Sequence, residues 1–283
     1  MESATGDEAL PAEAAGGGPA GGWSHQLRAI YTLWWRDLIR FVNEPARLVG
    51  SMVQPVIYLG LFGVGFGATF RAAAVPEGFR YVTFMFPGVL GMTVLFTALF
   101  SGVSVIWERQ FGLLKAILIA PVSRAAIVLG KALGGATVAV IQGTLLLLLA
   151  PLAGIDLSAG QVLRLWVAMG PMALALTGLG LAVASRMASM EAFQVVMNFL
   201  VMPLWLLSGA FFPLQGVPPW MEVLMRVNPL TYGVDALRSV IYEGVPYAGS
   251  LVAHDFAFDL AVVTLMAVVA LGLCLVTFKT QED

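Results

Sequence analysis

The sequence predicts an all-α polytopic membrane protein with about six transmembrane helices. Composition is the first observation: 59% of the 283 residues are hydrophobic and only 11% are charged, whereas soluble domains average about 25% charged residues. The second is that several nearly uncharged apolar runs are long enough to cross about 30 Å of hydrocarbon as helices. The net charge of −2 is too small to indicate a nucleic-acid partner. Cys274 is the single cysteine, which excludes an intrachain disulfide framework.

Residues 1–22 are acidic and then rich in glycine, proline and alanine. This composition predicts a disordered tail, because it offers too little apolar surface to bury. The segment has neither the basic start nor the apolar core of a signal peptide. We therefore expect the first transmembrane span to act as the insertion signal.

Residues 23–45 are predicted to form an amphipathic helix that lies in the membrane interface. The segment combines apolar residues at intervals of three to four positions with interrupting charges, namely Leu27, Ile30, Leu33, Trp34, Leu38 and Phe41 with Arg28, Arg36, Asp37 and Arg40. Tryptophan and arginine together are typical of interfacial helices, so Trp34, Trp35, Arg36 and Arg40 are the candidate anchors. The alternative, a helix packed on a soluble domain, is less favoured because the chain offers no such domain.

Six spans are expected within a transmembrane domain that covers residues 46–280. Their approximate limits are 47–70, 81–106, 125–153, 161–185, 192–212 and 256–278. Ser123 follows Pro121 and is predicted to be the N-cap of the third span. Ten of the fifteen lysine and arginine residues fall on the side that holds both termini, which predicts that both termini are cytoplasmic.

The segment between the fifth and sixth spans is too charged to cross the membrane and too apolar for a free loop. It contains two helix-like pieces, 218–227 and 229–243, separated by Asn228 and Pro229. Each piece is too short to span. We expect residues 217–243 to form a re-entrant helix pair in the outer leaflet, enclosed by protein. A helical hairpin that rests on the outer surface is the alternative.

No catalytic constellation is recognisable. The sequence lacks the GxxxxGK[ST] phosphate-binding loop and the residue sets of intramembrane proteases. His254, Asp255 and Asp259 could supply metal ligands at the outer mouth of the last span, but no second histidine or cysteine lies near them. We therefore predict no metal site.

Ion-coupled transport requires ionisable residues at mid-membrane, and the predicted spans contain mainly neutral polar groups there. These are Gln54, Thr97, Gln142, Asn198 and Ser208, which we expect to make interhelical hydrogen bonds. Lys131 lies about two turns inside the third span and is expected to extend towards the cytoplasmic face. A stand-alone secondary transporter or channel is therefore disfavoured, and stays the alternative function.

Residues 107–121 are predicted to form a helix in the cytoplasmic loop between the second and third spans. Trp107, Phe111, Leu114 and Leu118 share one stripe, which would rest against the span ends. Leu113 and Ile117 fall off that stripe, beside Glu108, Arg109 and Lys115. An exposed apolar face of this kind favours docking of a cytoplasmic protein over a longer, partly ordered loop.

The stretch "ERQFGLLKAILIAPVSR" resembles the coupling segment of type-2 ABC exporter permeases, the family of daunorubicin-type drug exporters, nodulation lipooligosaccharide exporters and polysaccharide exporters. The Glu108-Arg109 pair, Gly112 and the Ala-Pro-Val-Ser-Arg ending at Arg124 carry the resemblance. A second motif, Leu207–Arg238, is similar to the family's fifth-span exit and outer helices. Its matching residues are Gly209, Phe212, Pro213, Pro219, Trp220, Asn228, Pro229, Leu230, Asp235 and Arg238. The resemblance covers the chain from about residue 23 onward.

The resemblance implies a permease subunit in the bacterial plasma membrane, paired with a second copy or a similar subunit and served by two separate ATPase subunits. ATP and magnesium would bind those ATPases, so this chain would hold no cofactor and no catalytic site. The implied coupling residues are Glu108, Arg109, Phe111, Gly112, Leu113, Leu114, Lys115, Ile117, Pro121 and Arg124. The implied outer gate comprises Phe212, Pro213, Trp220, Asn228, Pro229, Asp235 and Arg238.

The resemblance also implies a substrate path at the dimer interface, lined by the first, second and fifth spans. The candidate lining is Gln54, Tyr58, Phe62, Phe96, Phe100, Asn198, Met202 and Trp205. For each residue alone, lipid contact or packing is the simpler interpretation. As a group, an aromatic and nearly uncharged wall favours the export of a hydrophobic or amphiphilic molecule, drug-like or lipid-linked.

Overall fold

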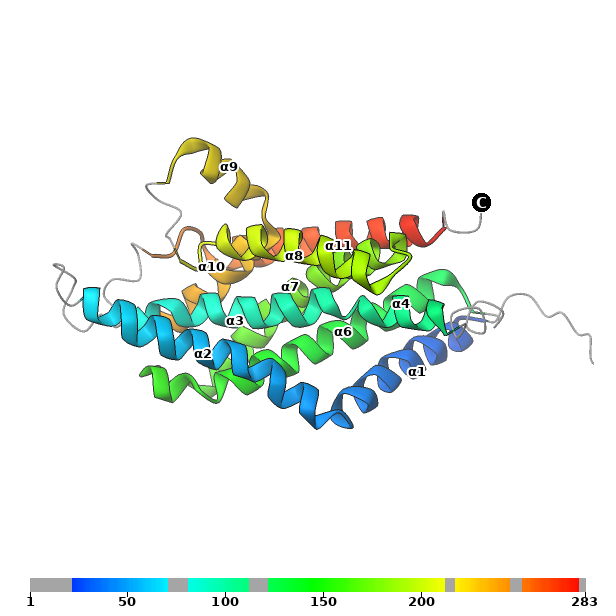
Figure 1. Cartoon of the computed structure of the whole chain (residues 1–283), viewed down its shortest axis with the longest axis horizontal. Coiled ribbons are helices and arrows are strands. Elements are labelled where there is room, and N and C mark those ends of the chain that lie inside the picture. The colour runs from blue at the N-terminus through cyan, green and yellow to red at the C-terminus, as the bar shows by residue number, and fades with distance from the viewer. Residues whose placement is uncertain (1–21, 71–80, 112–121, 212–216, 245–250, 280–283) are drawn as a thin grey trace, which may run out of the picture.

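The computed structural model of the chain describes residues 22–70, 81–111, 122–211, 217–244 and 251–279 (Figure 1). Every regular element within these residues is a helix. The elements are α1 Trp23–Val42, α2 Pro45–Phe70, α3 Tyr81–Phe100, α4 Val103–Gln110, α6 Arg124–Leu147, the short 3-10 helix Ala150–Ala153, α7 Ala159–Arg186, α8 Met190–Leu206, α9 Pro219–Val227, α10 Pro229–Ile241 and α11 Phe256–Lys279. The predicted tail at 1–22 falls, except for Gly22, outside the described residues.

Four stretches in the described part of the chain are long and apolar enough to cross a membrane. They are Tyr81–Gln110, Arg124–Leu147, Ala159–Arg186 and Phe256–Phe278. Two shorter apolar stretches, Val49–Leu61 and Met190–Leu206, fall in or largely in the first and fifth predicted spans. The prediction of an all-α polytopic membrane protein is confirmed.

Helix α3 forms the centre of the bundle. Most of its side chains are buried, because α2, α6, α7 and α10 all pack against it. Helix α11 packs mainly on α7 and leaves a broad apolar face exposed, made by Phe258, Leu265, Val268, Val269, Leu273 and Val276. A face of this composition suits contact with lipid.

Glycines allow α7 to approach the junction of α3 and α4 closely. The second predicted span is interrupted at Ser101 and Gly102, where α3 ends and α4 begins. A Cβ atom on Gly180 would lie 2.4 Å from the carbonyl oxygen of Leu99, and one on Gly102 would lie 2.6 Å from the carbonyl oxygen of Gly180. The helices therefore meet backbone to backbone, as small residues permit in membranes.

We expect Gly180→Ala to destabilise the fold by about 1–3 kcal/mol, because the new methyl group must push α7 away from α3. Gly170→Ala on the same helix is the matched control, since a Cβ atom there meets nothing within 4 Å. That control should be neutral or stabilising, because alanine favours a helix over glycine. Thermal unfolding of both variants in detergent tests the contact, and equal stability of the two would contradict it.

Helix α1 packs lengthwise on α6, a helix of the bundle and not part of a soluble domain. The indole nitrogen of Trp34 donates a hydrogen bond to the hydroxyl of Thr137 at 3.0 Å. Leu33 packs at Gly130, where a Cβ atom would come within 2.8 Å of it. The opposite face, with Leu27, Tyr31 and Trp35, is exposed and apolar. Interfacial placement of α1 stays a prediction.

Helix α8 ends at Leu206, six residues before the predicted end of the fifth span. Gly209 then adopts φ 77°, a left-handed conformation that glycine tolerates best. The carbonyl oxygens freed by this ending are bound by side chains of the next helices. Asn228 donates to Leu204 O at 2.6 Å, Thr231 to Leu207 O at 3.1 Å and Arg238 to Gly209 O at 2.8 Å, in that order.

The two short helices that follow α8 differ in their surroundings. Helix α10 is buried against α11, α7 and α3, which satisfies the requirement for a re-entrant helix. Helix α9 stands away from the bundle (Figure 1) and exposes Trp220, Val223, Leu224 and Val227. Within the single chain, protein encloses α10 but not α9, and re-entrant placement of the pair stays a prediction.

Candidate functional site

A cavity of about 210 Å³ lies between α1, α2, α3 and α6. Its lining consists of Phe41, Ser51, Gln54, Pro55, Met92, Thr93, Phe96, Thr97, Phe100, Val138 and Gln142. The aromatic rings of Phe96 and Phe100 stack with their centroids 6.2 Å apart. Because the lining that the structure describes contains no charged side chain, this cavity suits an apolar group with a few neutral polar atoms.

The polar atoms of the cavity connect three helices. The hydroxyl of Thr97 on α3 donates to the side-chain oxygen of Gln142 on α6, and the amide nitrogen of Gln142 donates to the hydroxyl of Ser51 on α2. The predicted interhelical role of Thr97 and Gln142 is thus confirmed. Hydrogen bonds to both the oxygen and the nitrogen of the amide also lower the cost of placing Gln142 among apolar residues.

Two further cavities continue from the first towards α4. One of about 50 Å³ shares Phe41, Thr97 and Val138 with it and adds Asp37, Arg40 and Ser104 among others. The next, of about 550 Å³, shares Arg40, Ser101 and Ser104 with the second and reaches Trp107 and Met190. The series leads from charged residues of α1 to an aromatic interior. Burial raises the pKa of Asp37 above its usual range, against the opposing charges of Lys131 and Arg36.

The eight residues predicted to line a path do not form one wall. Gln54, Phe96 and Phe100 line the cavity, whereas Tyr58 packs against the buried Trp205 with ring centroids 5.2 Å apart. The other three are separate, with Asn198 and Met202 exposed on α8 and the side chain of Phe62 outside the described residues.

Sequence reasoning missed the contributions of α1 and α6 to this cavity. The predicted path lies at a dimer interface, which a single chain does not show, whereas this cavity lies within one chain. Its described lining includes Phe41 of α1 and Val138 and Gln142 of α6, and no residue of α8. Gln142 was the available signal, because an amide inside an otherwise apolar span requires hydrogen-bonding partners on a neighbouring helix.

A cluster of charged residues joins α1, α4 and α6 at the α4 end of the bundle. Glu108 is 5% exposed. Its two carboxylate oxygens form ion pairs with Lys131 Nζ and Arg36 Nη2, each at 2.6 Å. Lys131 is 2% exposed, so its ammonium group ends at Glu108 inside the bundle rather than in solvent. Since Arg36 also approaches Asp37 at 3.4 Å, four charges hold three helices together.

Arg109 also makes contacts within the chain. Its guanidinium donates to the carbonyl oxygens of Ser185 at 2.9 Å and Met187 at 3.0 Å. Cations are favoured at the C-terminal end of a helix such as α7. Glu108 and Arg109 thus face the bundle. Any role in coupling to a partner would be indirect, through the position of α4.

Trp107 and Phe111 form the exposed apolar surface of α4. They are 42% and 75% exposed, with ring centroids 5.7 Å apart. The prediction that this stripe rests against the span ends is therefore wrong for these two residues. Six other predicted coupling residues, Gly112, Leu113, Leu114, Lys115, Ile117 and Pro121, lie outside the described residues. Arg124 is half-buried at the start of α6, where Ser123 accepts a hydrogen bond from Ala126 N as the predicted N-cap.

The remaining predicted residues divide between packing and exposure. On α1, Trp34 and Arg36 turn towards the protein, whereas Trp35 is exposed and Arg40 pairs with Glu44 at 3.2 Å. In the predicted gate, Arg238 is buried over the ring of Phe84 at 5.1 Å. Pro229 opens α10, Asn228 caps it, and Asp235 binds backbone N–H groups before α11. Phe212 and Pro213 lie outside the described residues.

Comparison with known proteins identifies the family. The profile of the ABC-2 type transporter family matches residues 28–242. The chain is 28% identical to the transport permease ycf38 of Cyanophora paradoxa, covering 75% of this chain and 73% of that protein. It is 28% identical to nodulation protein J of Rhizobium leguminosarum bv. viciae, covering 81% and 86%. It is also 28% identical to the multidrug ABC transporter permease YbhR of Escherichia coli K12, over 56% of this chain and 44% of that one. With a match across most of its length, the chain belongs to the ABC-2 type transporter family.

Proposed function

We propose that the chain is the permease subunit of an ATP-driven exporter that moves a hydrophobic or amphiphilic, drug-like or lipid-linked molecule out of the cytoplasm or inner leaflet. The observation that carries this proposal is the aromatic, uncharged cavity between α1, α2, α3 and α6. An apolar tail fits its interior. A polar head would lie in the adjoining cavities, which contain Arg40.

The proposed complex contains two permease copies and two separate ATPase subunits, which bind ATP and magnesium. Family membership and the names of the relatives, an ABC transporter permease among them, support an ATPase partner. The exposed Trp107 and Phe111 support a docking surface at α4. In this arrangement α4 and both termini face the cytoplasm of a bacterial cell, in line with the distribution of lysine and arginine.

The alternative, a stand-alone secondary transporter, would place an ionisable group on the substrate route at mid-membrane. The described charged clusters instead lie at the two ends of the bundle, at Glu108 and at Asp259 near the start of α11. This placement supports energy input from a separate ATPase. An ion gradient that drives transport by the purified permease alone would favour the alternative.

Assembly is the direct test. The purified chain alone should hydrolyse no ATP, whereas the chain co-expressed with its cognate ATPase should purify as a roughly 2:2 complex. Lipids and hydrophobic drugs should then stimulate ATP hydrolysis by that complex in nanodiscs. A complex that forms but responds only to sugars or inorganic ions would contradict the proposed substrate class.

Within that assay, Phe96→Ala should raise the substrate concentration for half-maximal stimulation about tenfold, because one aromatic contact contributes about 1.5 kcal/mol. Phe199→Ala on α8 is the matched control, since Phe199 is an exposed aromatic residue remote from the cavity lining. Equal responses of the two variants would exclude the cavity as the binding site.

A further inference from the structure

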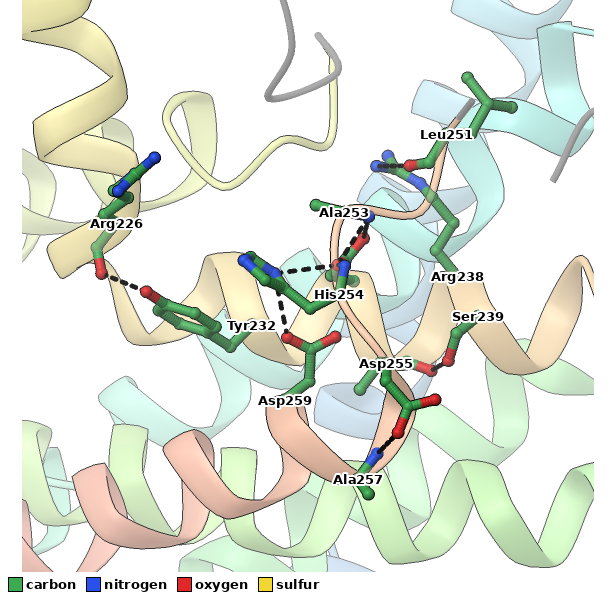
Figure 2. A network of polar contacts seen from close by, with 12 residues as sticks. Arg226, Tyr232, Arg238, Ser239, Leu251, Ala253, His254, Asp255, Ala257 and Asp259 are labelled. Carbon is green, nitrogen blue, oxygen red and sulfur yellow. Dashed lines mark hydrogen bonds and ion pairs between the residues drawn. The ribbon is translucent and has the colours of Figure 1, made fainter. Parts of the chain in front are cut away.

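A histidine and two aspartates meet where α10 and α11 are joined. Asp235 lies on α10, His254 on the connecting segment and Asp259 on the first turns of α11. His254 Nδ1 is 3.4 Å from Asp235 Oδ2 and 3.4 Å from Asp259 Oδ1. One ligand atom from each residue lies within 4.8 Å of the others. Figure 2 shows the imidazole of His254 turned towards the carboxylate of Asp259.

The atoms that face this cluster lack conventional partners. Asp259 is fully buried, and neither of its oxygens accepts a hydrogen bond from a described residue. His254 Nδ1 is also buried, and at 3.4 Å it donates to neither carboxylate. An ionised carboxylate without a partner is strongly unfavourable in a buried site. A cation bound between the three side chains would stabilise both carboxylates in their ionised form.

No described lysine or arginine supplies that charge by an ion pair to either aspartate. Arg238 lies one helical turn from Asp235, but its guanidinium donates to the carbonyl oxygens of Gly209 and Leu251. Arg226 pairs with Glu222 on α9. These two arginines are thus engaged elsewhere.

Surrounding contacts fix the ligands in place. The carboxylate of Asp235 accepts hydrogen bonds from the backbone nitrogens of Ala253 at 3.0 Å and His254 at 2.9 Å. The imidazole packs against the rings of Tyr232 and Phe258, with centroids 5.6 Å and 5.0 Å away. Such supporting contacts orient the ligands of metal sites and raise their affinity.

We propose that Asp235, His254 and Asp259 bind a divalent transition-metal ion, and that zinc fits the donor set best. Zinc accepts imidazole nitrogen and carboxylate oxygen together, whereas calcium and magnesium prefer oxygen alone. In a tetrahedral zinc site with bonds of about 2.0–2.1 Å, the ligand atoms lie about 3.3–3.4 Å apart. The two measured distances from His254 Nδ1 match that spacing. The ion would fasten α10 to the start of α11, independently of what the protein transports.

The fold supplies a ligand that the sequence did not suggest. Spacing along the chain grouped His254 with Asp255 and Asp259, whereas the structure replaces Asp255 by Asp235. The carboxylate of Asp255 is exposed and accepts a hydrogen bond from Ala257 N at 3.3 Å (Figure 2). Asp255 is therefore a matched control within five residues of two proposed ligands.

The test uses the full-length protein in detergent, freed of metal with a chelator and titrated with Zn²⁺ by calorimetry, with Mn²⁺ and Ca²⁺ for comparison. We expect one zinc ion per chain and a rise in Tm that EDTA reverses. His254→Gln and Asp259→Asn should each weaken zinc binding about 100-fold or more, since even changes to supporting contacts cost about 10–100-fold. Asp255→Asn and His25→Gln should bind zinc like the unmodified protein.

Asp259→Asn removes the unpartnered charge, so its metal-free form should unfold at the same or a higher temperature than the unmodified protein. His254 is partly exposed, which makes His254→Gln a second variant that folds if Asp259→Asn does not. Three results would overturn the proposal. They are no saturable zinc binding, binding that survives both ligand substitutions, and an equal loss of binding in Asp255→Asn.

Discussion

Glu108→Lys is expected to destabilise the fold by about 3–5 kcal/mol, the usual cost of leaving a buried charge without its partner. Glu108 lies between Lys131 and Arg36 and is nearly inaccessible. A lysine at this position would bring three cations together at the junction of α1, α4 and α6. Replacing the glutamate removes the group that makes their burial favourable.

Thermal and denaturant unfolding in detergent measure this effect. Lys131→Glu should be similarly destabilising, whereas the exchange Glu108→Lys with Lys131→Glu should recover part of the loss. Recovery should be incomplete, because Arg36 would then face a lysine. Additive effects in the double variant would show that the two side chains do not interact.

Replacing Trp107 and Phe111 together by alanine is expected to abolish docking of the ATPase while leaving the permease folded. Both rings are exposed and contact each other, so their loss leaves no buried cavity. Aromatic residues at the centre of an interface contribute about 2 kcal/mol each or more, which corresponds to about 1,000-fold weaker binding for the pair. This prediction rests on the proposed function.

Co-purification with the cognate ATPase and calorimetry of the separate subunits measure the loss. Val195→Ala with Phe199→Ala is the matched control, since these two residues are exposed on α8. An unchanged Tm with lost binding is the expected pattern for the α4 pair. Unchanged binding of the ATPase by the Trp107→Ala, Phe111→Ala variant would show that α4 is not part of the docking surface.

Substitutions at Glu108 and at Trp107 and Phe111 are expected to have different effects, because these side chains lie on different sides of α4. The sequence predicted that Trp107 and Phe111 rest against the span ends and that Glu108 and Arg109 lie beside a docking face, whereas the structure exposes the two aromatic residues and turns the charged pair towards the bundle. Glu108 could equally have faced a partner or the bundle, because a helix presents all its sides and only the neighbouring elements decide which is covered. Lys131 meets Glu108 only because the fold brings this part of α6 within reach of α4.

The lining of the cavity likewise depends on how the helices pack, which the pattern of a single helix does not reveal. Phe96 and Phe100 were named as path residues through the family resemblance, and both line the cavity. Their spacing follows from the period of a single helix. Gln142 and Phe41 join them through packing between helices distant in sequence, which no local pattern encodes. Asn198 and Met202 share the composition of the lining residues but lie on an exposed face of α8.

Local chemistry was enough to determine the elements of this protein. Apolar length determined the membrane class, Ser123 and Asn228 marked helix starts through their capping side chains, and Pro229 separated α9 from α10. These features depend on residues within one or two turns of each other, so the sequence alone specifies them. Tertiary structure decided the partners, namely Glu108 with Lys131, Gln142 with Ser51, and Asp235 with His254 and Asp259. The physical reason is that burial and low dielectric give a charge or an amide its role, and both arise only when separate helices pack together.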